Sequence, residues 1–425
     1  MNSPNDPALR SFIDVAAESH FPIQNLPWGV FRHGKGPARV GTAIGSYVLD
    51  LALLEELGLL DVASLSVPKV FARPTLNPLM ECGRAAWREV RAQISSLLSA
   101  NEPTLRDDET LRKRALLPAA DCEMLMPAAI GDYTDFYSSK YHASNVGTML
   151  RGPENALPPN WLHLPIAYHG RSSSVMLSGT DFRRPQGQTK SDMAATPSYG
   201  PSRNVDFELE MACFIGPGNR LGESVPIDQA EDQIFGVVLM NDWSARDLQK
   251  WEYAPLGPFL AKNFATSISP WVVPLEALEP FRVEGETQDP PVLDYLQRTG
   301  PAAFDIQLEV RLSPEGAAES TLVTQSNARH LYWSMSQQIA HHTVNGCNLR
   351  PGDLLGTGTI SGPTPESRGC LLERTMGGRE PLDLAAGGTR RFLEDGDRVT
   401  MTGWCQGDGY RVGFGQVTGQ LLPAR

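Results

Sequence analysis

Acidic and apolar residues alternate strictly from position 206 to position 211. Successive side chains of a β-strand point to opposite faces, so Asp206, Glu208 and Glu210 would share one face and the apolar residues between them the other. An isolated stretch of this kind is typical of a half-exposed strand whose acidic face meets water. The unbroken apolar run 211–215 that follows indicates burial instead. Buried carboxylates need a partner, and a hard divalent cation is the usual one.

The hydrophobic pattern elsewhere predicts a β-rich chain with few long helices. Short apolar runs separated by glycine-rich turns predict N-terminal strands at 28–32, 38–44 and 46–51. Helical spacing of apolar residues predicts helices at 51–60, 77–100, 143–151, 227–233, 244–250 and 329–342. The heavily charged stretch 101–115 is typical of an exposed connector. We place a domain boundary after residue 122, which gives domains 1–122 and 123–425.

Composition agrees with a soluble globular protein that is rich in turns. The chain has 39 glycines and 34 prolines among 425 residues. Its formal net charge of −12 argues against nucleic acid or an anionic membrane as a partner. The six cysteines form no CxxC pair, which favours buried, reduced thiols. We find no signal-peptide pattern and no apolar run of membrane-spanning length, so we expect a cytoplasmic protein.

Two further carboxylates lie in apolar or aromatic surroundings. Asp135 stands among aromatic residues, and Asp242 ends an apolar run. Together with the acidic strand, they suggest a cluster of oxygen ligands for a metal ion. Arg246 and Gln249 follow Asp242 at the spacing of a first helical turn, where an ordinary capped helix is the alternative interpretation.

Three other features are candidates for chemistry. His142 is a candidate general base, since imidazole is the side chain best suited to proton transfer near neutral pH, although a lone histidine is more often structural. Lys262 lies among apolar neighbours, where it is either held by an anion or reaches outward to water, and the sequence slightly favours the second alternative. The loop 356–362 is small and hydroxylated, which suits close approach of its backbone to a ligand, but it lacks the lysine of a P-loop.

Taken together, these stretches resemble the fumarylacetoacetate hydrolase family. The blocks that carry the resemblance occur in the family's order, at 131–139, 159–165, 206–212, 240–247, 251–260, 342–355 and 405–415. The resemblance implies a mainly β fold with some α, in which a small SH3-like N-terminal barrel precedes a C-terminal mixed β-roll of this family's type. It also implies a homodimer.

The resemblance also implies a metal site that agrees with the carboxylate argument. Its ligands for Ca²⁺ and/or Mg²⁺ would be Asp135, Glu208, Glu210 and Asp242. Lys262 and Thr266 match positions of a second, magnesium-type contact. An ammonium cannot ligate a cation, so Lys262 would contribute its backbone carbonyl.

The implied reaction is hydrolysis of the carbon–carbon bond of 4-fumarylacetoacetate to fumarate and acetoacetate, the last step of tyrosine and phenylalanine catabolism. His142 matches the general base and Glu373 the carboxylate that orients it. Arg246, Gln249 and Lys262 match groups that stabilise an oxyanion. Contacts to the dianionic β-diketone substrate would come from Tyr137, Arg151, Tyr168, Arg246, Gln249, Tyr253 and Thr359, with Arg151 suited to a carboxylate.

Some positions depart from the family pattern, and two alternative functions remain open. Ala261 and Ala265 stand where glycine is typical, which changes the shape of the pocket but not the class of reaction. A related metal-dependent hydrolase, decarboxylase or isomerase acting on another oxo-acid is the first alternative. A non-catalytic metal-binding protein is the second. The presence of both His142 and Glu373 favours hydrolysis, because a decarboxylase needs no activated water.

Overall fold

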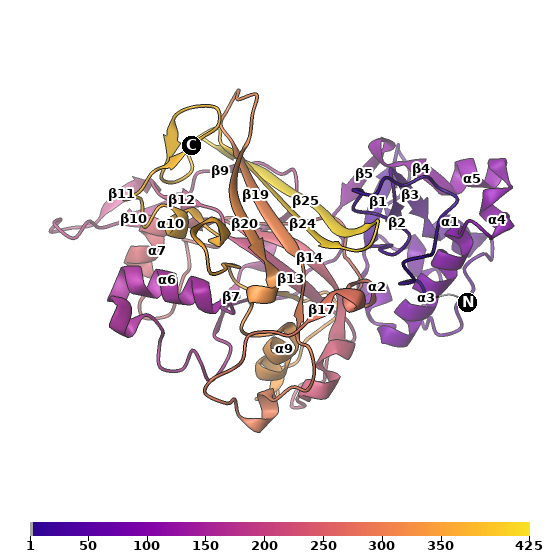
Figure 1. Cartoon of the computed structure of the whole chain (residues 1–425), viewed down its shortest axis with the longest axis horizontal. Coiled ribbons are helices and arrows are strands. Elements are labelled where there is room, and N and C mark those ends of the chain that lie inside the picture. Colours follow the sequence, from indigo (N-terminus) through magenta and orange to yellow (C-terminus); the bar gives the residue numbers. More distant parts are fainter. Residues whose placement is uncertain (1–2) are drawn as a thin grey trace.

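The computed structural model describes residues 3–425, which form a smaller N-terminal part beside a larger C-terminal part (Figure 1). The N-terminal part is built on an antiparallel five-stranded sheet of order β4-β3-β2-β1-β5. Its strands are β1 (Trp28–His33), β2 (Arg39–Ile44), β3 (Tyr47–Asp50), β4 (Leu116–Pro118) and β5 (Cys122–Leu125). The three strands predicted near the N-terminus are therefore confirmed.

Helices make up much of the rest of this part, and one stretch differs from expectation. They are α1 (Leu51–Glu56), α2 (Asn77–Met80), α3 (Gly83–Leu98), α4 (Pro103–Arg106) and α5 (Glu109–Ala115). The stretch 101–115 is largely exposed, as predicted, but it is not an irregular connector, because α4 and α5 lie there. Two of its charges are helix caps: Glu102 accepts from the Thr104 amide at 3.2 Å, and Asp108 from the Leu111 amide at 2.9 Å.

The C-terminal part contains two larger mixed sheets, which confirms the predicted mixed β architecture. The first has the order β7-β6-β21-β13-β14-β16-β8, and the second β20-β19-β24-β25-β9. The strands of the first are β6 (Tyr133–Phe136), β7 (Ala167–Gly170), β8 (Val175–Leu177), β13 (Leu209–Ile215), β14 (Ile234–Asp242), β16 (Thr266–Ile268) and β21 (Leu354–Gly356). Those of the second are β9 (Phe182–Arg183), β19 (Gln307–Ser313), β20 (Thr321–Asn327), β24 (Arg398–Gln406) and β25 (Arg411–Leu422).

Short ladders and helices complete the C-terminal part. The two-stranded ladders are β10 (Gln186–Thr189) with β11 (Ser198–Pro201), β12 (Val205–Asp206) with β15 (Ser244–Ala245), β17 (Arg282–Val283) with β18 (Ala303–Phe304), and β22 (Leu382–Asp383) with β23 (Thr389–Arg390). The helices are α6 (Lys140–Arg151), α7 (Arg246–Glu252), α8 (Leu275–Leu278), α9 (Met335–Thr343) and α10 (Leu371–Arg374). The helix predicted at 227–233 is a 3₁₀-helix, and that predicted at 329–342 begins later, as α9.

The two faces of β13 pack against different parts of the molecule. The odd-numbered residues of β13 lie in the core shared with β19, β24 and β25. Ala212 and Phe214 lie in the core shared with the N-terminal part, where Trp87 packs edge-on to Phe235 with ring centroids 5.1 Å apart. Glu210 belongs by its parity to this second face. Glu210 therefore lies on the same face of the sheet as Ala212 and Phe214, the face that packs against the N-terminal part.

The acidic stretch is not one continuous strand. The chain leaves β12 at Asp206 and enters β13 only at Leu209, so residues 207–208 interrupt the predicted alternation. The apolar residues of the stretch are buried in the core, as predicted. Asp206 accepts from the backbone amides of Leu371 and Leu372 of α10 and does not join Glu208 and Glu210 in the cluster of candidate metal ligands.

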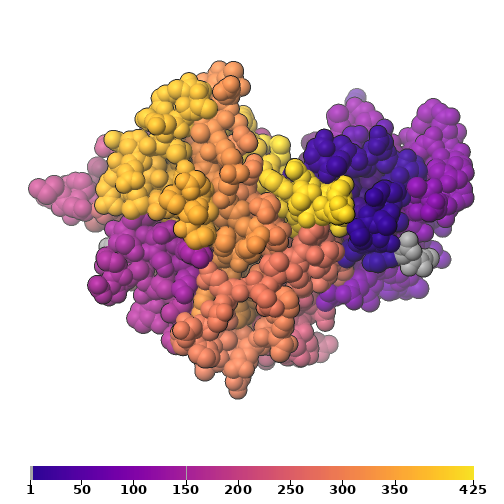
Figure 2. Space-filling view, in the orientation of Figure 1, coloured from indigo at the N-terminus to yellow at the C-terminus, as the bar shows by residue number. Residues whose placement is uncertain are grey.

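The N-terminal lead-in contacts the C-terminal hairpin. Figure 2 shows indigo N-terminal residues against the yellow surface of the last strands. Here the Gly413 amide donates to the His20 carbonyl at 2.9 Å, and the Asn25 side chain donates to the Gly413 carbonyl at 2.8 Å. The domain boundary after residue 122 stays a prediction; it falls at the start of β5, which pairs with β1. Within 3–425, no helix is long and apolar enough to cross a membrane.

Candidate active site

Four buried carboxylates from three adjacent regions of the large sheet meet at one point. Candidate ligand oxygens of Asp135, Glu208, Glu210 and Asp242 all lie within 4.8 Å of one another. Strand register produces this meeting. Glu210 lies opposite Met240 on β14, Gly356 of β21 lies opposite Asp135, and the Asp242 amide donates to the Glu208 carbonyl at 3.3 Å. The sequence-predicted quartet is thus brought together.

The electrostatics of this cluster fit a divalent cation. Burial, followed by the charge of Asp242, raises the pKa of Asp135 to about 8. Burial, followed by the charge of Asp135, raises the pKa of Glu210 well above its usual value. Oε1 of Glu210 is buried and has no hydrogen-bond partner among residues 3–425. A buried, unpartnered carboxylate oxygen is costly, and a hard cation with oxygen ligands relieves that cost.

The glycine-rich loop after β21 supports the carboxylates. The Gly358 amide donates to Glu210 Oε2 at 3.0 Å and to Asp135 Oδ1 at 3.2 Å. Gly358 has a φ of +76°, and a Cβ there would lie 2.2 Å from the Phe136 carbonyl oxygen, so a larger residue does not fit. The loop thus brings its backbone close to the site's acidic ligands.

Lys262 is directed into the cluster, not toward water. Its ammonium donates to Glu208 and, at 2.7 Å, to Asp242 Oδ2, and the residue is buried. The sequence slightly favoured a lysine that reaches outward to water, and this interpretation is wrong. The ammonium instead turns inward, because two buried carboxylates attract it. Thr266 donates to Asp242 Oδ1 at 2.7 Å. The roles of Lys262 and Thr266 as metal contacts stay predictions.

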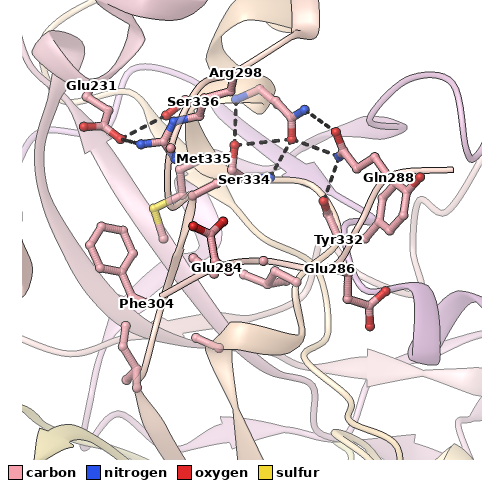
Figure 3. A pocket seen from close by; sticks show the side chains of 18 of the residues that line it. Glu231, Glu284, Glu286, Gln288, Arg298, Phe304, Tyr332, Ser334, Met335 and Ser336 are labelled. Atoms are coloured by element: carbon pink, nitrogen blue, oxygen red, sulfur yellow. Dashed lines mark hydrogen bonds and ion pairs between the residues drawn. The ribbon is translucent and has the colours of Figure 1, made fainter. Parts of the chain in front are cut away.

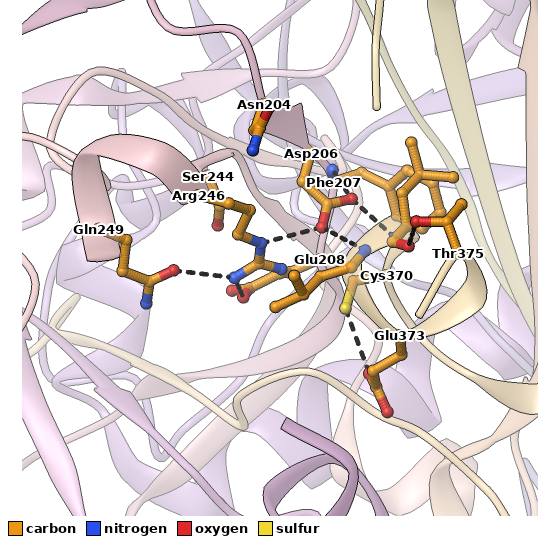
Figure 4. A network of polar contacts seen from close by, with 12 residues as sticks. Asn204, Asp206, Phe207, Glu208, Ser244, Arg246, Gln249, Cys370, Glu373 and Thr375 are labelled. Atoms are coloured by element: carbon orange, nitrogen blue, oxygen red, sulfur yellow. Dashed lines mark hydrogen bonds and ion pairs between the residues drawn. The ribbon is translucent and has the colours of Figure 1, made fainter. Parts of the chain in front are cut away.

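Arg246, at the start of α7, is held by its neighbours on two sides (Figure 4). Its Nε donates to Asp206 Oδ2 at 2.9 Å, and its Nη1 donates to Glu208 Oε1 at 2.7 Å and to Gln249 Oε1 at 3.1 Å. Its Nη2 is buried and lacks a partner within the described part of the chain. Burial raises the pKa of Glu208, but the charges of Lys262, Arg246 and His142 lower it by more. The net pKa lies below its usual value, so this carboxylate is ionised.

A histidine–carboxylate pair lies beside the cluster. His142 Nδ1 is 2.6 Å from Glu373 Oε2, and both side chains are buried. Burial raises the pKa of Glu373, but His142 and further hydrogen bonds lower it to about 2. Glu373 is thus an acceptor, so the ring proton of His142 is on Nδ1 and the lone pair is on Nε2. The two residues are 231 positions apart, which is why spacing alone could not pair them.

Sequence reasoning missed three residues that hold Glu373. Asn145 donates to Oε1 at 2.8 Å, while Ser361 at 2.8 Å and Cys370 at 3.2 Å donate to Oε2. Asn145 is three residues after His142 on α6, so helical spacing was an available signal for it. His142, Cys370 and Glu373 are also close enough to hold a metal ion, but hydrogen bonds already join them.

The predicted substrate contacts fall into two groups. Tyr168 donates to Asp242 Oδ2 at 2.8 Å, the Tyr137 ring packs edge-on to His142 at 5.4 Å, and the buried Thr359 hydroxyl has no partner in the described residues. Arg151 instead donates to backbone carbonyls of residues 155 and 156, and Tyr253 is 48% exposed. The structure brings Tyr168 to the carboxylate cluster and Tyr137 to His142, and the role of all five residues as substrate contacts stays a prediction.

A separate cavity of about 240 Å³ is not this site (Figure 3). Its lining includes Glu231, Arg298, Phe304 and Met335. Arg298 is already neutralised there, because its Nη2 donates to Glu231 Oε1 at 2.5 Å. None of the predicted site residues is among the described residues that line it.

The raised pKa values make the stability of the metal-free protein depend on pH. A carboxyl whose pKa is higher in the folded protein stabilises the fold fully below its unfolded pKa of about 4, and this contribution is lost as the pH rises through the folded pKa. Asp135, with a pKa of about 8, and Glu210 belong to this class. The free energy of unfolding should therefore fall between about pH 5 and pH 8, by up to about 1.4 kcal/mol per pH unit for Asp135, and Glu210 adds a contribution of the same sign.

Urea unfolding after chelation, repeated across this pH range, measures the effect. Glu208 and Glu373, whose pKa values are lowered, change stability only below about pH 4.5 and do not mask it. Saturating Ca²⁺ or Mg²⁺ should remove the slope. Four histidines whose pKa values are lowered by burial, His20, His330, His341 and His342, add a slope of the opposite sign up to about pH 6.5, so metal-free Glu210→Gln serves as the reference. The same pH dependence in metal-free wild type and metal-free Glu210→Gln would contradict the assignment of these carboxyls.

Comparison with known proteins agrees with this geometry. The family model "Fumarylacetoacetate (FAA) hydrolase C-terminal" matches residues 133–421, and "Fumarylacetoacetase N-terminal" matches residues 24–127. The chain is 56% identical to the fumarylacetoacetase of Arabidopsis thaliana over 98% of this chain and 99% of that protein. It is 57% identical to the fumarylacetoacetase of Homo sapiens over 97% of this chain and 99% of that protein.

A solved structure shares the fold. The fumarylacetoacetate hydrolase of Exiguobacterium antarcticum aligns with a TM-score of 0.53 and 17% identity, over 94% of this chain and 100% of that chain. Two family models that together span nearly the whole chain, and relatives of more than half identity over their full length, leave no ambiguity of membership. The chain belongs to the fumarylacetoacetate hydrolase family.

Proposed function

We propose that this protein hydrolyses the carbon–carbon bond of 4-fumarylacetoacetate to fumarate and acetoacetate, the last step of tyrosine and phenylalanine catabolism. The observation that carries the proposal is the 2.6 Å His142–Glu373 pair beside a buried carboxylate cluster. A base for water next to a site for a cation is what hydrolysis of a β-diketone requires. Relatives of 52–57% identity carry the name fumarylacetoacetase.

The protein's own residues carry out the proton transfers. His142 Nε2 takes a proton from water, whose oxygen attacks the carbonyl carbon of the fumaroyl group. Glu373 holds the ring through Nδ1 and stabilises the imidazolium that forms. The carbon–carbon bond then breaks, its electron pair leaves with the acetoacetate carbon, and His142 returns the proton to that carbon. One water is consumed, and fumarate and acetoacetate are released.

Buried cations and hydrogen-bond donors act on the negative charge that develops on the attacked carbonyl oxygen. Arg246 has a free Nη2, and the Lys262 ammonium lies between Glu208 and Asp242. Gln249 fixes the guanidinium by accepting from Nη1. Donors that are already oriented in a buried site stabilise such a charge without reorganising.

The metal ligands in this proposal are Asp135, Glu208, Glu210 and Asp242, with Lys262 and Thr266 at a second, magnesium-type contact. Their oxygen donor set suits Ca²⁺ or Mg²⁺. When bound, the cation supplies Lewis-acid stabilisation of the charge on the diketone oxygens. We also propose Tyr137, Arg151, Tyr168, Tyr253 and Thr359 as substrate contacts, with Arg151 for a carboxylate of the dianion. We also propose a homodimer, which rests on the family resemblance, and a cytoplasmic location, which rests on the sequence pattern.

Product analysis tests the substrate. We expect the purified protein with Ca²⁺ or Mg²⁺ to consume fumarylacetoacetate and to release equal amounts of fumarate and acetoacetate, measured by absorbance and by chromatography. Simpler acylpyruvates should react more slowly, because they lack the second carboxylate. Faster turnover of an acylpyruvate, with no fumarate from fumarylacetoacetate, would instead support the related oxo-acid hydrolase.

A further inference from the structure

Asp206 is a fully buried carboxylate that the proposed chemistry does not use. Its side chain accepts hydrogen bonds from two separate elements (Figure 4). On one side, Arg246 Nε donates to Oδ2 at 2.9 Å. On the other side, the amide of Leu371 donates to Oδ1 at 2.7 Å, and that of Leu372 donates to Oδ2 at 2.9 Å. One carboxylate therefore joins the start of α7 to the start of α10.

The start of α10 depends on this carboxylate. The first amides of a helix have no partner within it. Cys370, the N-cap residue of α10, makes no side-chain capping bond, so Asp206 supplies the acceptor from 165 residues away. Glu373 follows Leu372 directly on this short helix. Its position relative to His142 thus depends on where Asp206 holds α10.

We propose that Asp206 is a positioning residue that fixes Arg246 and Glu373 relative to each other. This inference rests on the proposed function, in which Arg246 stabilises the oxyanion and Glu373 orients His142. With Nε held by Asp206 and Nη1 held by Glu208, the guanidinium leaves only Nη2 free for the reacting oxygen. The same carboxylate holds α10, which carries Glu373 of the His142–Glu373 pair. Asp206 therefore fixes the position of Arg246 relative to that pair.

The arrangement requires a carboxylate and not only its shape. Oδ2 accepts from both Arg246 and Leu372, and Oδ1 accepts from Leu371. An asparagine amide accepts at only one of these two atoms, and its NH₂ would face N–H groups at the other. Asp206→Asn therefore breaks the bonds to α7, to α10 or to both, while the volume of the side chain hardly changes.

Asp397 offers a matched control, because its side chain bonds to none of the candidate site residues. It is also buried, and it accepts from Arg390 Nε at 2.8 Å, Arg390 Nη2 at 3.0 Å and the Glu394 amide at 2.8 Å. Asp206→Asn should lower kcat about 100-fold with little change in KM, as loss of an oxyanion donor does. Asp397→Asn should retain kcat after a comparable loss of thermal stability. Wild-type kcat in Asp206→Asn, or an equal loss in both variants, would overturn the proposal.

Non-additivity separates positioning from a general structural role. Glu373→Gln should cost much less in the Asp206→Asn background than in the wild type, because the carboxylate is already displaced there. Costs that multiply would show that Asp206 acts independently of Glu373 and would overturn the proposal. A wild-type protein that does not turn over fumarylacetoacetate would refute the proposed function instead.

Hydrogen exchange tests the structural link without activity and without replacing Asp206. In Arg246→Gln, Asp206 loses the donor that holds it from α7 and is less fixed in position, so the Leu371 and Leu372 amides should exchange at least tenfold faster, a change of about 1.4 kcal/mol in local opening. The Glu394 amide, which is bonded to Asp397, should keep its rate. Unchanged exchange at Leu371 and Leu372 would show that Asp206 does not couple α7 to α10.

Discussion

Replacing His142 with alanine should lower kcat roughly 10³- to 10⁴-fold while the protein remains folded and binds its cation. The imidazole is the basic group next to Glu373, and because Nδ1 is bonded to Glu373 at 2.6 Å, Nε2 carries the lone pair that takes a proton from water. Removing it leaves the cations that stabilise charge but no base. Steady-state turnover, thermal unfolding and cation titration of the same preparation measure the three properties separately.

His341→Ala is the control for this variant. His341 lies on α9, where its Nδ1 contacts the Tyr295 hydroxyl at 3.0 Å, away from the carboxylate cluster. Its replacement should leave kcat unchanged. Glu373→Gln should lower kcat in the same direction as His142→Ala, and the double variant should be little worse than His142→Ala alone. Full turnover by a folded His142→Ala variant would contradict the assignment of the base.

Replacing Glu210 with glutamine should weaken cation binding by at least about 100-fold and lower turnover with it. Glu210 gives one of four clustered carboxylates, and its Oε1 has no partner among residues 3–425. The same change should leave the metal-free protein at least as stable as metal-free wild type, because burial and the charge of Asp135 make an ionised Glu210 costly, whereas the glutamine amide is neutral at every pH. Calorimetric titration with Ca²⁺ and thermal unfolding with a chelator measure the two effects.

Glu276→Gln is the matched control for Glu210→Gln. Glu276 is also a buried carboxylate, but it pairs with Arg84 at 2.9 Å and with Arg88 at 3.2 Å, close to the N-terminal part. We expect this variant to lose stability and to keep its cation affinity. Equal affinity of Glu210→Gln and wild type for Ca²⁺ and for Mg²⁺ would exclude Glu210 as a ligand.

The acidic and apolar alternation at 206–211 is an example of what the sequence could predict and what it could not. Period-two burial is a local property, so the pattern at 206–211 placed Glu208, Glu210 and their apolar neighbours correctly. It did not predict that Asp206 lies outside the cluster, because that carboxylate bonds to α10, far along the chain. The charged stretch 101–115 was misjudged for a different reason: its acidic residues cap helices.

Long-range pairing sets the limit for the site. The apolar sequence neighbours of Lys262 favour an ammonium that reaches out to water. Its observed inward orientation is due to Glu208 and Asp242, which accept hydrogen bonds from the ammonium. Glu373 meets His142 across 231 residues, and only the family resemblance could propose that pair. Asn145 is an exception, since its spacing from His142 on α6 is local.

The central claim is that a cation held by buried carboxylates and the water activated by His142 act together on fumarylacetoacetate. The most direct test follows the loss of fumarylacetoacetate absorbance by the wild-type protein before chelation, after chelation, and after Ca²⁺ or Mg²⁺ is added back. We predict rapid loss, then none, then recovery with either or both ions. Full turnover after complete removal of the cation, verified by elemental analysis, would contradict the account.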